Sequence, residues 1–113
     1  MTARNKLTTA PPYAVEDALR RLGANLRTAR IRRKLTIREV AEKIGTGPRP
    51  VSDAEKGKPS TGVAVYVALL WTYRLLHRLD DVADSSLDKE GLALALHREP
   101  VRARRSNLLD GDF

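Results

Sequence analysis

The chain has 113 residues, the length of one small domain, and a formal net charge of +7. It contains no cysteine, which excludes disulfides and thiolate metal sites and agrees with a reducing cytoplasm. No apolar run approaches the roughly 20 residues of a membrane span, and the N-terminus lacks the apolar core of a signal peptide, so we expect a soluble cytoplasmic protein.

The positive charge lies in the first half of the chain. Residues 1–50 contain 12 Lys and Arg against four Asp and Glu, whereas residues 51–113 contain nine against ten. A basic half predicts a polyanionic partner for that half, and the alternative is that these charges only solvate helix faces.

Residues 1–12 show no hydrophobic periodicity and end in two prolines, so we predict a flexible N-terminal arm. Over residues 14–34 the spacing of apolar residues predicts an amphipathic helix, although Gly23 costs about 1 kcal/mol inside it. The sequence TIRE at residues 36–39 is a capping box, which predicts a second, short helix. Gly45 is expected to end that helix. The apolar stripe of the first helix comprises Val15, Ala18, Leu19, Leu22, Leu26 and Ala29.

The stretch GTGPRPVSDAEKGK, residues 45–58, contains two prolines where a helix is otherwise indicated. If Gly47 is the N-cap, Pro48 and Pro50 occupy the first and third helical positions, whose amides have no acceptor within the helix. The prolines therefore predict a helix that begins at Pro48, runs to Lys56, and ends at a left-handed Gly57.

Residues 62–84 have apolar residues at helical spacing, and we predict two helices with a break near Thr72–Arg74. We interpret Trp71 as part of the core or of a dimer surface, because its neighbourhood is not basic enough for base stacking. Residues 91–97 alternate like a strand, but their composition favours a helix that Ser85 or Ser86 would cap. The tail that follows is expected to stay mobile, and the fold class is all-α with five or six helices.

Two short helices joined by a glycine turn form a helix-turn-helix unit. Residues 22–70 resemble the Xre/Cro family, which is related to the lambdoid phage repressors. The resemblance implies a lambda-repressor-like helix-turn-helix domain at residues 13–84, preceded by the arm 1–12 and followed by an extension, 85–113, for dimer or partner contacts. The matching residues are Ala41, Gly45, Val51, Ala54 and the sequence EKGK at 55–58.

The resemblance implies DNA contacts by position. Arg49 is the only strong base reader, since its guanidinium can bind guanine in a bidentate manner. The family usually has polar residues where this chain has prolines, so sequence reading would depend on few contacts together with DNA shape. The base-contact positions are Pro48, Arg49, Ser52, Asp53 and Arg38; the predicted phosphate contacts are Arg27, Arg33, Lys43, Lys56 and Lys58; and Arg30 and Glu55 are expected to form a structural ion pair.

Residues 74–104 resemble the segment that follows the helix-turn-helix in HipB-like antitoxins of HipBA-type toxin-antitoxin systems. The similar features are a leucine-rich helix ending in Asp-rich sequence, the motif Asp88–Gly91, and the basic sequence PVRAR at residues 100–104. This resemblance implies a homodimeric repressor of an inverted-repeat operator that also binds a HipA-like kinase toxin. The predicted partner-binding residues of the tail are Leu108, Leu109 and Phe113.

Two alternatives remain open: a stand-alone Xre-family repressor without a toxin, and an interaction module whose basic face binds an acidic protein. The two histidines, His77 and His97, lie in separate segments without metal-ligand spacing, and no phosphate-binding loop occurs. We therefore expect no enzymatic activity, no metal and no cofactor.

Overall fold

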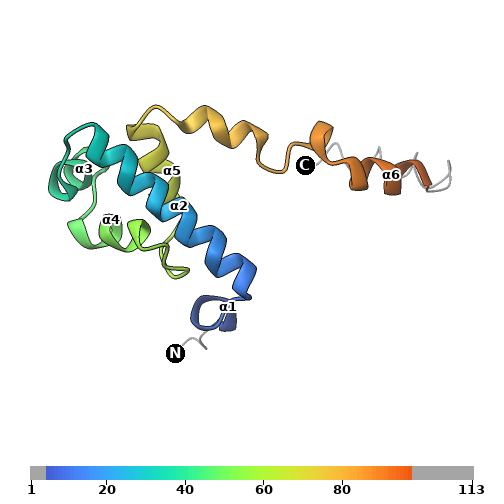
Figure 1. Ribbon diagram of the computed structural model, residues 1–113, viewed down its shortest axis with the longest axis horizontal. Coiled ribbons are helices and arrows are strands. Elements are labelled where there is room, and N and C mark those ends of the chain that lie inside the picture. The colour runs from blue at the N-terminus through green and yellow to red at the C-terminus, as the bar shows by residue number, and fades with distance from the viewer. Residues whose placement is uncertain (1–4, 98–113) are drawn as a thin grey trace. The chain divides into compact units, whose positions relative to one another are not determined.

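The structure is a computed structural model and describes residues 5–97, which contain helices and no strands (Figure 1). This confirms the all-α fold class and shows that residues 91–97 are helical. The elements are α1 (Lys6–Thr9), α2 (Tyr13–Arg32), α3 (Ile37–Ile44), α4 (Pro48–Glu55), α5 (Val63–Thr72), the 3₁₀-helices η1 (Leu76–Asp81) and η2 (Ser85–Leu87), and α6 (Lys89–His97).

The chain divides into two compact units, Met1–His77 and Arg78–Phe113. In the first unit, α3 and α5 pack on α4, and α2 lies against α4 (Figure 1). Its core comprises Leu26, Ala29, Val40, Ala41, Val51, Ala54, Tyr66, Leu69 and Tyr73. In the second unit α6 packs against η2, and none of the described residues is buried.

The starts of α3 and α4 confirm the interpretation of the capping box and of the prolines. The Thr36 hydroxyl accepts a hydrogen bond from the Glu39 amide at 3.0 Å, and the Glu39 carboxylate accepts one from the Thr36 amide at 2.8 Å. Gly45 ends α3 with φ of 81°, and Gly47 is the N-cap of α4, so Pro48 begins that helix.

Gly23 is buried where α2 packs against the end of α4. A Cβ atom at position 23 would lie 2.6 Å from the carbonyl oxygens of Ala54 and Glu55. At Gly57, a Cβ atom would lie 2.5 Å from the carbonyl oxygen of Leu19. Gly23 is therefore the residue that permits backbone contact with α4, and not merely a weak point of α2.

Four local expectations need correction. The predicted arm contains α1, whose N-cap Asn5 accepts a hydrogen bond from the Leu7 amide. In α2, the first part of the predicted apolar stripe, Val15 and Ala18, is exposed. The break predicted near Thr72–Arg74 is confirmed at Arg74, but the second helix of residues 62–84 is the 3₁₀-helix η1 and not an α-helix.

The fourth concerns the start of α6. The Gly91 amide donates to the Asp88 carboxylate at 2.9 Å, so Asp88, and neither Ser85 nor Ser86, caps this helix. An aspartate directly before the first turn is as good an N-cap as serine.

We expect Gly23→Ala to lower the free energy of unfolding by about 2 kcal/mol, since the added methyl group meets backbone atoms that cannot rotate away. Urea denaturation followed by circular dichroism measures the change. Thr28→Ala, which places the same side chain on the exposed side of α2, should change stability by less than about 0.5 kcal/mol. Equal effects of the two substitutions would contradict the close approach.

Candidate nucleic-acid interface

The elements α3 and α4 form two short helices connected by a tight turn. After Ile44 the chain takes the left-handed conformation at Gly45, and the Thr46 amide donates to the Ala41 carbonyl at 2.9 Å. This hydrogen bond closes the end of α3, and three residues separate α3 from α4. Ala41 is fully buried where the two helices pack, and its small side chain permits the close packing.

A buried ion pair connects α2 to the end of α4. The Arg30 Nε and Nη2 atoms donate to the two carboxylate oxygens of Glu55 at 2.7 and 3.1 Å, and Nη1 donates to the Leu35 carbonyl at 2.9 Å. The side chains are only 12% and 5% exposed. The hydrogen bonds to Glu55 raise the pKa of Arg30, so the guanidinium stays charged. The structure thus brings together the two residues predicted to form a structural ion pair.

A comparison with known protein families matches residues 21–84 to the family described as a helix-turn-helix domain. This match covers more than half of the chain. The chain belongs to the helix-turn-helix domain family. Its broad class is therefore that of a DNA-binding regulator. Neither the curated proteins nor the solved structures contain a significant match.

In the helix-turn-helix domain, α4 carries the residues predicted to contact bases. Arg49 extends from the first turn with 86% of its side chain exposed, and Pro48 beside it is also exposed. Ser52 is half-buried. Arg38 of α3 and Pro48 line the same hollow, so these two nominated residues lie close together.

Asp53 has partners within the protein. Its carboxylate lies 3.2 Å from the Lys58 ammonium and 4.0 Å from the Arg49 guanidinium. The four-residue spacing of Arg49 and Asp53 on one helix is visible in the sequence, but the approach of Lys58 depends on the turn after α4. The Asp53 carboxylate is therefore paired with Lys58 and Arg49, and a hydrogen bond from cytosine to this carboxylate would have to compete with these two cations.

The predicted phosphate contacts differ in whether the side chain already has a partner within the protein. Arg27 and Lys56 are exposed and form no ion pair within residues 5–97, so they are the simplest candidates. Lys43 lies over the ring of Trp71 at 6.0 Å, and Lys58 is paired with Asp53. These two side chains already have partners that the sequence did not indicate.

Arg33 has a structural role. Its guanidinium donates to the Ala29 and Tyr73 carbonyls at 2.9 Å each and lies 5.5 Å from the centre of the Tyr73 ring. It thus joins the end of α2 to Tyr73, the residue that directly follows α5. Phosphate contact by Arg33 stays a prediction, and it would compete with the hydrogen bonds that the Arg33 guanidinium makes within the protein.

In the described part of the chain, no helix is long and apolar enough to cross a membrane, and no cluster of His, Cys, Asp and Glu side chains is arranged to bind a metal ion. The nominated tail residues Leu108, Leu109 and Phe113 lie outside the described residues.

Tyr73 should make the stability of the domain depend on pH in the alkaline range. Its side chain is fully buried, and its hydroxyl has no hydrogen-bond partner among residues 5–97. Burial, together with the nearby negative charge of Glu55, raises the pKa of Tyr73 from 10.0 to about 12. The folded chain therefore keeps the phenolic proton at pH values where the unfolded chain has released it. The free energy of unfolding is unaffected by this group below about pH 10 and falls as the pH rises from about 10 to about 12.

We expect Tyr73→Phe to reduce this loss by about 1–2 kcal/mol and to leave stability near neutral pH unchanged or slightly raised, because the unpaired hydroxyl is removed. Urea denaturation at about pH 9 and about pH 11.5 gives the comparison. The exposed Tyr13 provides the matched control, Tyr13→Phe, which should keep the wild-type pH dependence. The same pH dependence in both variants would contradict the assignment.

Proposed function

We propose that the protein is a sequence-specific transcriptional repressor that places α4 in the major groove of its operator. The observation that carries the proposal is the position of Arg49. Its side chain is 86% exposed at the N-terminal turn of α4, and the N-terminal residues of the second helix are those that meet base edges in a helix-turn-helix complex. The other end of α4 is held by the buried pair of Glu55 and Arg30.

The chemistry of α4 favours a short base-specific contact. Arg49 offers a bidentate pair of donors to guanine, and Pro48 offers an apolar surface to a thymine methyl group. The Asp53 carboxylate is 4.0 Å from Arg49, which supports a role in orienting the guanidinium. With so few base contacts, the deformability of the operator contributes the remaining specificity.

Phosphate contacts from Arg27, Arg33, Lys43, Lys56 and Lys58 would supply the salt-dependent part of the affinity. Among these, Lys56 is the cleanest case, because it directly follows α4 and is exposed. It is not paired with any acidic side chain of the described residues.

The proposed active form is a homodimer on an inverted repeat. An eight-residue α4 with one strong base reader gives a small interface, and a second half-site about one helical turn away doubles it. Exposed apolar side chains of the second unit support a dimer surface. These residues are Val82, Leu87, Leu92 and Leu96.

The more specific proposal is that of an antitoxin that binds operator DNA and a HipA-like kinase toxin in the cytoplasm, at the nucleoid. It is supported by the resemblance of residues 74–104 to HipB-like antitoxins and by the second unit, whose described residues include exposed leucines and no buried side chain. Such a segment gains apolar burial when a partner covers it. The stand-alone repressor remains the alternative.

Arg49→Ala should weaken binding to an operator selected from random-sequence DNA by about 1–3 kcal/mol, with little effect on unselected DNA, because it removes a base contact. Lys56→Ala should instead weaken binding to the operator and to unselected DNA by similar amounts. It should also make the slope of the logarithm of the binding constant against the logarithm of the salt concentration shallower by about one. Fluorescence anisotropy at several salt concentrations measures both effects. Equal losses on both DNAs for Arg49→Ala would exclude a base-reading role.

A pair of variants tests the dimer and the toxin separately. Leu92 and Leu96 are one turn apart on α6 and both exposed. The double variant Leu92→Ser with Leu96→Ser should therefore leave the first unit folded. Its mass, measured by light scattering, should fall from that of a dimer to that of a monomer. Deletion of residues 106–113 should keep the dimer mass and operator affinity within about threefold, since it removes none of the predicted phosphate contacts. The same deletion should weaken capture of a kinase-like protein encoded by the adjacent gene.

Leu94→Ser is the matched control, because position 94 lies about 200° around the helix from position 92 and is also exposed. A monomer from Leu94→Ser as well would contradict a specific dimer face. If the full chain captures no adjacent-gene kinase, the antitoxin proposal is wrong and the stand-alone repressor stands.

A further inference from the structure

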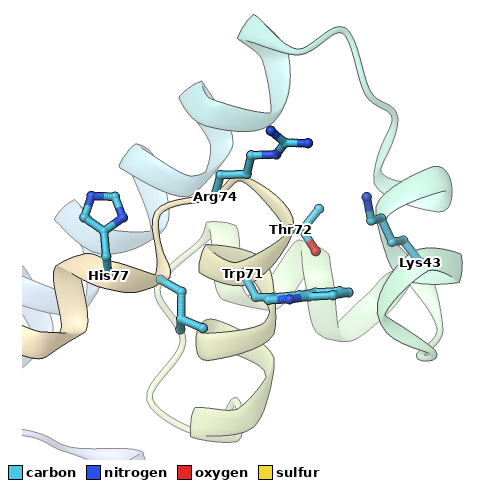
Figure 2. Close-up of a pocket in the computed structure, with 6 residues that line it drawn as sticks. Lys43, Trp71, Thr72, Arg74 and His77 are labelled. Carbon is cyan, nitrogen blue, oxygen red and sulfur yellow. The ribbon is translucent and has the colours of Figure 1, made fainter.

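A hollow in the first unit is lined by cationic and aromatic side chains (Figure 2). Its volume is about 420 Å³, within the usual range for a small-molecule site. One wall comes from α3 and the other from the end of α5 and the residues that follow. The lining residues are Lys43, Trp71, Thr72, Arg74, Leu76 and His77.

Trp71 provides an accessible aromatic surface in this hollow. Its side chain is 54% exposed, and the Lys43 ammonium lies 6.0 Å from the centre of its ring. In Figure 2 the Lys43 and Arg74 side chains reach toward the same space from the two walls. The Thr72 hydroxyl donates to the Ala68 carbonyl at 3.0 Å, so its oxygen can still accept a hydrogen bond.

The charge of the hollow is uncompensated by the described part of the chain. No acidic residue lines it, and within residues 5–97 neither Lys43 nor Arg74 forms an ion pair. Two cations beside an exposed aromatic ring favour a ligand that carries both a negative charge and a flat apolar face.

The backbone at Arg74 supplies a second, independent observation. Arg74 has φ of 60°, in the left-handed region, and the Leu75 amide donates to the Leu70 carbonyl at 2.8 Å to close the end of α5. Glycine would adopt this conformation without strain. This turn ends α5 and places the Arg74 side chain in the lining of the hollow, so the backbone supplies the hollow with its second cation.

We propose that this hollow binds a small aromatic carboxylate, with the ring against Trp71 and the carboxylate accepting hydrogen bonds from Lys43 and Arg74. The site is distinct from the proposed base-reading surface, and it shares one residue, Lys43, with the predicted phosphate contacts. Lys43 and Arg38 are five positions apart on α3, about 140° around the helix, and Arg38 lines a different hollow with Pro48. The proposal therefore does not depend on the proposed repressor function.

The test uses the full-length protein and benzoate as the probe. Trp71 is the only tryptophan of the chain, so its fluorescence reports directly on the hollow. We expect benzoate to change this fluorescence saturably, and both benzamide and cyclohexanecarboxylate to bind at least about tenfold more weakly, because each lacks either the charge or the aromatic ring. The absence of saturable binding, or equal binding of benzamide, would overturn the proposal.

Variants assign the two cations. Lys43→Gln and Arg74→Gly should each weaken benzoate binding by about tenfold, and Arg74→Gly should also keep or raise the melting temperature, since glycine relieves the left-handed backbone. Lys34→Gly is the matched control, because Lys34 is an exposed cation with φ of 57° outside the hollow. It should leave benzoate affinity unchanged.

Two results would contradict the assignment. An equal loss of benzoate affinity in Lys34→Gly would show that binding follows the general positive charge. Unchanged benzoate affinity in Lys43→Gln and Arg74→Gly, combined with a shallower salt dependence of DNA binding, would assign both residues to phosphate contact and overturn the proposed site.

Discussion

The buried pair of Arg30 and Glu55 is the interaction on which the arrangement of the first unit depends. The Arg30 guanidinium, at the end of α2, donates hydrogen bonds to Glu55, the last residue of α4, and to the Leu35 carbonyl just before α3. Three segments are therefore held by one planar group. Removing one member of such a pair leaves a buried charge without a partner, at a cost of about 3–5 kcal/mol. Because Glu55 ends α4, the pair also directs the opposite end of α4, where Arg49 lies, toward solvent.

A steric constraint acts beside this electrostatic one. Gly23 and Gly57 bring the backbone of α2 against the end of α4, and a side chain at either position would meet main-chain atoms. The close approach places Arg30, two turns further along α2, near Glu55. The ion pair and the two glycines thus determine the same helix crossing, the glycines through the backbone distance and the ion pair through directed hydrogen bonds.

The basic side chains of the first unit serve several purposes. Arg30 and Arg33 hold helices together through hydrogen bonds to Glu55 and to the Ala29 and Tyr73 carbonyls. Lys58 is paired with Asp53, and Lys43 lies over Trp71. A high net charge indicates a polyanionic partner for the surface as a whole. It does not distinguish the cations that bind such a partner from those that stabilise the fold, and the contacts of each side chain make that distinction.

The sequence by itself determined both ends of α3 and the start of α4, because the Thr36 capping box, the left-handed Gly45 and the proline at position 48 act within a few residues along the chain. It placed the end of α4 at Lys56, one residue beyond the observed Glu55. It also indicated Arg30 and Glu55, through resemblance to a known family. Only the tertiary structure decided that Gly23 contacts α4, that Arg33 bonds Tyr73 from 40 positions away, and that Lys43 faces Trp71. These contacts depend on how helices pack, and packing brings together residues whose spacing along the chain carries no local signal. The 3₁₀ conformation of η1 belongs to the same class, since helical periodicity in the sequence does not distinguish it from an α-helix.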